Sequence, residues 1–104
     1  MAAAILTLNS RAEQRRLYDL IAALPFVQQI ETPVRRLDLW SVEATGETIP
    51  DERFGRLCAD ALLKGMARGD LSFLLFQNII VAMIAKGRCD RIEIGFLQTI
   101  GERL

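Results

Sequence analysis

The fold of this 104-residue chain is decided by residues 48–86, which read TIPDERFGRLCADALLKGMARGDLSFLLFQNIIVAMIAK. In the first half of this stretch, apolar residues from Phe54 to Met66 recur three and four positions apart. That spacing places them on one face of a helix, with charged residues on the opposite face. Thr48 opens the helix and Gly69 ends it. The first half therefore predicts an amphipathic helix with one buried face.

The second half, residues 71–86, is apolar around its whole circumference, and Asp70 and Gly87 are placed to begin and end it. A helix that is apolar on all sides is usually surrounded by others, which predicts that this helix is the centre of the fold. Gln77 and Asn78 interrupt it. Burial without hydrogen-bond partners would cost about 1–3 kcal/mol for each amide. Either they bond inside the monomer, or the helix is partly exposed and covered by a second copy or a target.

The N-terminal third predicts two short strands around one helix. Residues 3–8 form a brief apolar run, and residues 34–42 alternate with the period of a strand. Between them, Ser10 and Glu13 make a capping box that opens a helix over about 11–24. If the two strands pair around this helix, they form a parallel β-α-β unit with a right-handed crossover.

The C-terminal segment fits two interpretations. Asp90 with Glu93 makes another capping box, and the apolar spacing that follows suits a helix of about 91–103. Gly95 and Gly101 disfavour a helix, and the stretch RIEIGF would also fit a strand. We prefer the helix on the strength of the capping box.

These elements predict a single compact domain, residues 1–104, of the α+β class and mainly helical. Three or four helices surround the central apolar helix 71–86, and residues 3–8 and 34–42 supply a small β element. Half of the residues are apolar and a quarter are charged, which is typical of a globular domain.

The composition disfavours an enzyme. The chain has no histidine, so Ser-His and Cys-His nucleophile arrangements are excluded. Cys58 and Cys89 are too far apart for a metal-type spacing, and the sequence contains no phosphate-binding or calcium loop. We therefore expect no catalytic residue, no cofactor and no metal. Cys58 falls on the apolar helix face and should be buried, whereas Cys89 lies in a polar turn.

The expected location is the cytoplasm. The N-terminus lacks the basic and apolar regions of a signal peptide. The apolar run 71–85 is shorter than the roughly 20 residues that a membrane span needs, so no membrane partner is expected. Two unpaired cysteines suit a reduced compartment.

Two surfaces are candidates for binding. A lone Trp on an alternating strand usually lies in the core, but Trp and Arg also often anchor protein interfaces. The candidate partner-binding residues are Trp40, Arg36, Asp38, Arg35 and Asn78. The alternative is a nucleic-acid surface on the first helix and the 34–42 strand, formed by Arg11, Arg15, Arg16, Arg35 and Arg36. Thirteen acidic residues balance thirteen basic ones, which disfavours duplex binding.

Elimination leaves a non-enzymatic protein-interaction module as the leading class. The expected function is that of a small inhibitor, immunity or adaptor protein of bacterial, phage or mobile-element origin, which occludes the surface of a protein partner. A homodimer formed through the third helix or through the edge of the 34–42 strand is compatible with this function. The alternative is a nucleic-acid-associated protein.

Overall fold

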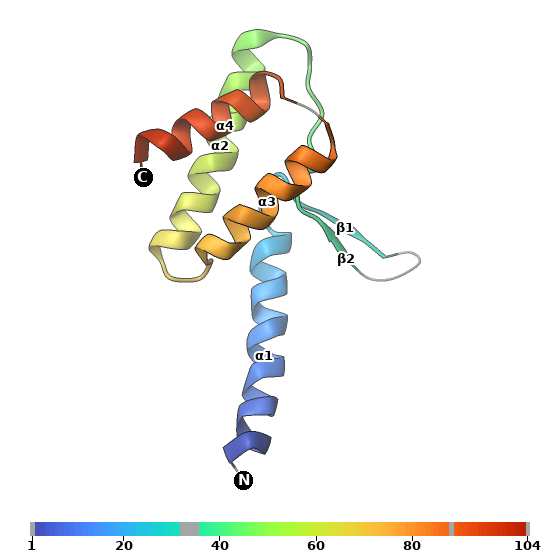
Figure 1. Ribbon diagram of the computed structural model, residues 1–104, viewed down its shortest axis with the longest axis vertical. Coiled ribbons are helices and arrows are strands. Elements are labelled where there is room, and N and C mark those ends of the chain that lie inside the picture. Colours follow the sequence, from blue (N-terminus) through green and yellow to red (C-terminus); the bar gives the residue numbers. More distant parts are fainter. Residues whose placement is uncertain (1, 32–35, 88, 104) are drawn as a thin grey trace.

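The computed structural model describes residues 2–31, 36–87 and 89–103, with side chains from residue 11 onward (Figure 1). The elements in chain order are α1 (Ala2–Ala22), β1 (Gln28–Ile30), β2 (Arg36–Asp38), α2 (Thr48–Ala67), α3 (Phe73–Ala85) and α4 (Arg91–Arg103). The mainly helical α+β class is confirmed. Most of α1 projects away from the other elements as a long single helix (Figure 1).

The structural centre is the crossing of α2 and α4, which are the two helices in closest contact. Two glycines make this approach possible. A Cβ atom on Gly55 would overlap the carbonyl oxygen of Ile92, and one on Gly95 would lie 2.6 Å from the carbonyl oxygen of Glu52. Each helix thus presents a bare stretch of backbone to the other, and any larger side chain would force the helices apart.

Aromatic rings fill the core beside this crossing. Phe26, Trp40 and Phe96 are buried, and their ring centroids lie 5.0–5.8 Å apart in tilted and edge-on arrangements. These are the separations and angles that aromatic pairs favour. Phe26 and Trp40 flank the β-hairpin and Phe96 belongs to α4, so this cluster attaches the hairpin to the helices.

The predicted β element is wrong in one of its two members and in its direction. Residues 3–8 lie inside α1, because the run of good helix formers Ala2–Ala4 lets the helix begin well before Ser10. Of residues 34–42 only Arg36–Asp38 form a strand, and residues 32–35 lie outside the described part. The strand pairs antiparallel with Gln28–Ile30, since a short connection cannot support a parallel pair.

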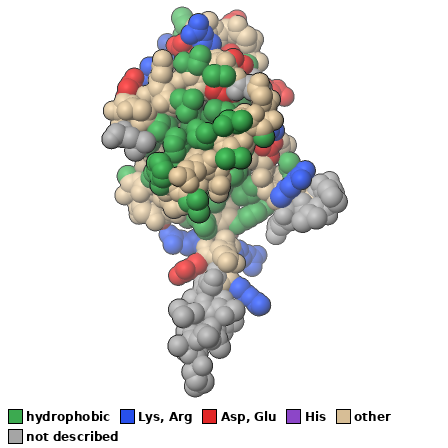
Figure 2. Space-filling view, in the orientation of Figure 1, with side chains coloured by type: hydrophobic (Ala, Val, Ile, Leu, Met, Phe, Trp, Pro, Cys, Tyr) green, Lys and Arg blue, Asp and Glu red, His purple; other side chains and the backbone are tan. Residues whose placement is uncertain are grey.

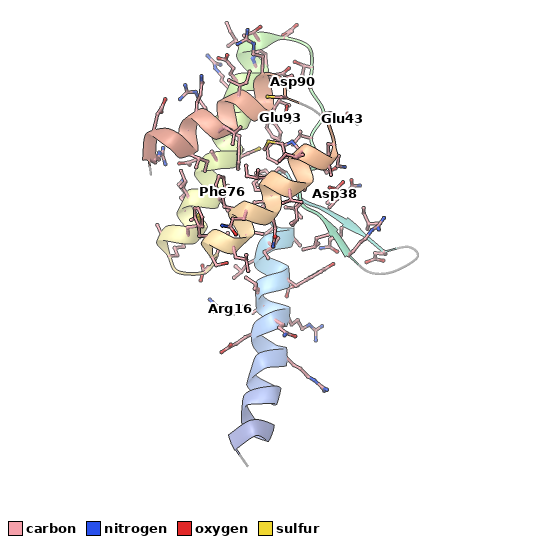
Figure 3. The ribbon with its side chains drawn as sticks, viewed as in Figure 1. Arg16, Asp38, Glu43, Phe76, Asp90 and Glu93 are labelled. Atoms are coloured by element: carbon pink, nitrogen blue, oxygen red, sulfur yellow. The ribbon has the colours of Figure 1, made fainter. Side chains whose placement is uncertain are left out.

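The capping box predicted for α4 is confirmed, and so is the helical interpretation of 91–103. The backbone N–H of Asp90 donates to Oε1 of Glu93 over 3.0 Å, and the N–H of Ile92 donates to Oδ1 of Asp90 over 3.3 Å. Figure 3 places Asp90 and Glu93 together at the start of the helix. Gly95 disfavours a helix by propensity alone, but it occupies the crossing with α2, where no larger residue fits.

The prediction that 71–86 is the central helix is wrong. α3 begins at Phe73, and it buries only the side that carries Leu75, Ile79 and Met83. Its other side is uncovered, because α2 and α4 pack on each other and α1 leads away from them (Figure 1). Asp70 does not cap the helix; it forms an ion pair with Arg16 at 3.1 Å.

The loop before α2 is held by the buried carboxylate of Asp51. This carboxylate accepts hydrogen bonds from the N–H of Thr45 (3.0 Å), the Thr45 hydroxyl (2.8 Å) and the N–H of Gly46 (3.2 Å). The backbone bond from Thr45 is the main reason that the pKa of Asp51 lies below its ordinary value of 3.8, although burial opposes it. The ionised carboxylate therefore stabilises the fold above the ordinary pKa.

We expect Asp51→Asn to lower the urea midpoint at pH 7, because an amide cannot accept all three hydrogen bonds. The ionised Asp51 carboxylate ceases to stabilise the fold as the pH falls through the lowered pKa that this group has in the folded state. The difference between parent and variant should therefore narrow below pH 3.8. Glu43→Gln changes an exposed carboxylate of the same loop and is the control. A difference that stays constant down to pH 2 would contradict this role of Asp51.

Candidate interaction surface

The uncovered side of α3 is the most unusual surface of the described chain. We call it the α3 face; it comprises Phe73, Leu74, Gln77, Asn78, Val81, Ile84 and Ala85, all exposed. The exposed fractions of its large apolar side chains are 51% for Phe73, 62% for Leu74, 64% for Val81 and 72% for Ile84. Figure 2 shows hydrophobic side chains gathered where α3 crosses the front of the molecule.

The arrangement follows directly from the helical spacing. Positions 73, 77, 81 and 84 are four, four and three residues apart, so their side chains share one side of the helix. Leu75, Ile79 and Met83 have the same spacing on the opposite side, which faces the core. A sequence that is apolar all round thus supplies both a buried side and a second, uncovered one.

Gln77 and Asn78 lie in the middle of this face and are exposed to solvent. The interpretation that both amides are buried within the monomer is therefore wrong, and the alternative of a partly exposed helix holds. Each amide group carries a donor and an acceptor. Both amides can therefore bond to polar groups of whatever molecule covers the face.

No residue from 71 to 85 is charged. The two charged residues that directly flank this stretch are both paired within the chain. Asp70 pairs with Arg16 at 3.1 Å, and Lys86 pairs with Asp38 at 2.7 Å. A molecule that docks on the face would therefore desolvate apolar and amide groups of α3, and no charged group of this helix.

The structure separates the predicted partner-binding residues. Trp40 is 1% exposed and its Nε1 donates to Oε2 of Glu93 over 2.7 Å, so this indole is part of the core and is not available to a partner. Asp38 is half-buried and paired with a lysine, whereas Arg36 is exposed on the hairpin. Arg35 lies outside the described residues. Of the five candidates, only Asn78 lies on the α3 face.

The predicted arginine group is also divided. Arg11, Arg15 and Tyr18 follow one side of α1 and line a surface depression of ≈ 390 Å³ that also contains Asp19. Arg16 instead reaches Asp70 beyond the end of α2. Arg36 belongs to the β-hairpin, and Arg35 lies outside the described residues. The arginines therefore do not make one continuous basic face across the described residues.

The titratable groups show no clustering that would suggest a metal site. Within residues 2–31, 36–87 and 89–103, no three Cys, Asp or Glu side chains converge to hold an ion. Cys58 is buried and Cys89 exposed, as expected, and burial raises the pKa of the Cys58 thiol to about 12. None of the described helices combines the length and hydropathy that crossing a membrane requires.

The four residues that dominate the candidate surface, Phe73, Leu74, Val81 and Ile84, were expected in the core. The available signal was the pair of amides at the centre of the same helix turn, which suits an exposed face better than a core. The fold and surface together define a small, mainly helical α+β domain with one uncovered apolar helix face. No family model, curated protein or solved structure matches the chain.

Proposed function

We propose that this chain is a non-enzymatic protein-interaction module and that the α3 face is its binding surface. The observation that carries the proposal is the exposure of four large apolar side chains on one uncharged helix face. Single exposed apolar residues are common on monomers, but contiguous groups of them mark interaction sites. The module acts by covering an apolar protein surface, as an inhibitor, immunity or adaptor protein does.

The energetics support a docking role. Full burial of a large apolar side chain contributes about 1.5–3 kcal/mol, so covering the half that is still exposed contributes about 1 kcal/mol for each residue. Phe73, Leu74, Val81 and Ile84 together supply a gain that can offset part of the entropy lost on association. The absence of charged residues from 71 to 85 removes the desolvation penalty that charged groups on this face would carry.

The chemistry of the face specifies the chemistry of its partner. The complementary surface is apolar and uncharged, with hydrogen-bonding groups opposite Gln77 and Asn78. A second α-helix meets these requirements, since two helix faces can interlock their side chains along the length of α3. We propose that binding takes place in the cytoplasm, where the exposed thiol of Cys89 would stay reduced.

Val81→Glu should abolish partner binding, because it places a carboxylate among the apolar side chains of the interface. The measurement is a tagged pull-down from the source cell, in high salt and with nuclease, with quantification by mass spectrometry. Ile49→Glu is the matched control: Ile49 is 65% exposed, against 64% for Val81, and lies in the first turn of α2. An acid in that turn is tolerated by the helix dipole.

A stoichiometric protein that is retained by the parent and by Ile49→Glu, and lost with Val81→Glu, would support the proposal. Equal retention by both variants would contradict it, because binding would then not involve the α3 face. If the captured material is lost when nuclease or high salt is added, the result would instead favour a nucleic-acid partner that binds the α1 arginines Arg11 and Arg15.

A further inference from the structure

We infer that the molecule covering the α3 face is a second copy of this chain, docked with its α3 antiparallel about a two-fold axis. The axis passes between Gln77 and Asn78. This inference rests on the proposed function, since it names the partner of the same face. The identity of the bound molecule and the register of the two α3 helices can both be measured.

Two pairs of residues on the α3 face lie symmetrically about one point of the helix. Leu74 and Val81 both lie on the α3 face and are equally far from the midpoint between Gln77 and Asn78. A two-fold axis at that midpoint brings Leu74 of one copy opposite Val81 of the other. An isologous contact requires this self-complementarity, because both copies contribute the same surface.

The amides at the centre satisfy one another in this register. Gln77 of each copy lies opposite Asn78 of the other, and each side chain offers an N–H donor and a carbonyl acceptor. The two-fold symmetry makes the exchange reciprocal, so no amide is buried without a partner. Two amides at the centre of an apolar helix face also fix the register, as a polar residue does at the core of a coiled coil.

The absence of charge from the face favours a second copy for a further reason. Identical surfaces bring like charges together wherever a charged residue lies near the axis. α3 has none over residues 71–85, and Asp70 and Lys86 at its ends are paired within their own chain. Two copies can therefore meet along the whole helix without repulsion between like charges.

Site-specific cross-linking tests both the partner and the register. In a Cys89→Ser background, Asn78→Cys places a thiol beside the axis, and Ile84→Cys places one far from it. Thirteen residues of helical rise, about 20 Å, separate the two copies of position 84 in the antiparallel register. A short bis-maleimide should therefore yield on the order of tenfold more covalent dimer from Asn78→Cys than from Ile84→Cys.

A second measurement leaves the amides intact. An equimolar mixture of Leu74→Cys and Val81→Cys, in the same background, should cross-link more efficiently than either variant alone, because these positions face each other. Unchanged Trp40 fluorescence confirms that each variant is folded. Equal yields from Asn78→Cys and Ile84→Cys, together with no gain from the mixture, would overturn the inference.

The outcomes separate this inference from the proposed function. If no covalent dimer forms but Val81→Glu still abolishes capture of a different protein, the second copy is the wrong partner and the α3 face remains a binding surface. If neither cross-linking nor capture depends on the face, both proposals fail.

Discussion

Replacing Gly55 by alanine should lower the free energy of unfolding by about 3 kcal/mol, at the upper end of the range for overpacked sites. The new methyl group would meet the carbonyl oxygen of Ile92 and the backbone nitrogen of Phe96, and neither can rotate away as a side chain could. The α2–α4 crossing would have to open, and the aromatic core beside it would loosen. Urea unfolding, followed through the single buried Trp40, measures the loss.

Gly101→Ala is the matched control for Gly55→Ala. It makes the same change inside a helix, but nothing lies within 4 Å of the added Cβ. Alanine is the better helix former by about 1 kcal/mol, so this variant should be as stable as the parent or more stable. If Gly55→Ala were as stable as Gly101→Ala, the close contact of α2 with α4 would be wrong.

Replacing Glu93 by alanine should cost about 3 kcal/mol, because two separate bonds are lost at once. Oε1 of Glu93 accepts the N–H of Asp90 and completes the capping box, while Oε2 accepts the indole N–H of Trp40. Alanine would leave the indole donor buried without a partner. Glu93→Gln should cost less, since its single carbonyl oxygen can keep one of the two bonds.

A double-mutant cycle separates the contribution of the indole. In a Trp40→Phe background the donor is absent, so Glu93→Ala should cost about 1–2 kcal/mol less than it does in the parent. Circular dichroism follows unfolding in all four proteins, because Trp40 fluorescence is lost in two of them. An identical cost in both backgrounds would show that the bond from Trp40 to Glu93 does not stabilise the fold.

Local signals were sufficient for the three C-terminal helices. The spacing from Phe54 to Met66, the glycines after α2 and α3, and the Asp90–Glu93 box all act within a few residues, and the helices that they predict are present. One member of the predicted apolar face, Leu57, is 55% exposed. The strand β1 could not be predicted in this way. It contains two glutamines and an isoleucine, and only its pairing with β2 makes it a strand.

The position of α3 depended on information that a single helix does not contain. An apolar circumference shows that a helix can be buried on every side, but not whether the chain has elements left to cover it. Gly55 and Gly95 let α2 and α4 pack closely on each other, and α1 projects outward. Neither α2, α4 nor α1 therefore covers the outer side of α3. The role of Trp40 as a partner-binding candidate is excluded by a contact that the local sequence does not show, because its acceptor Glu93 lies far away in the sequence.

Sedimentation equilibrium of the parent beside Val81→Glu and Ile49→Glu tests the central claim most directly. If the α3 face binds a second copy, the parent and Ile49→Glu should sediment at twice the 11.7 kDa chain mass, and Val81→Glu should sediment as the monomer. A parent that remains monomeric at high concentration, or a Val81→Glu dimer as stable as that of the parent, would contradict the binding of a second copy through the α3 face.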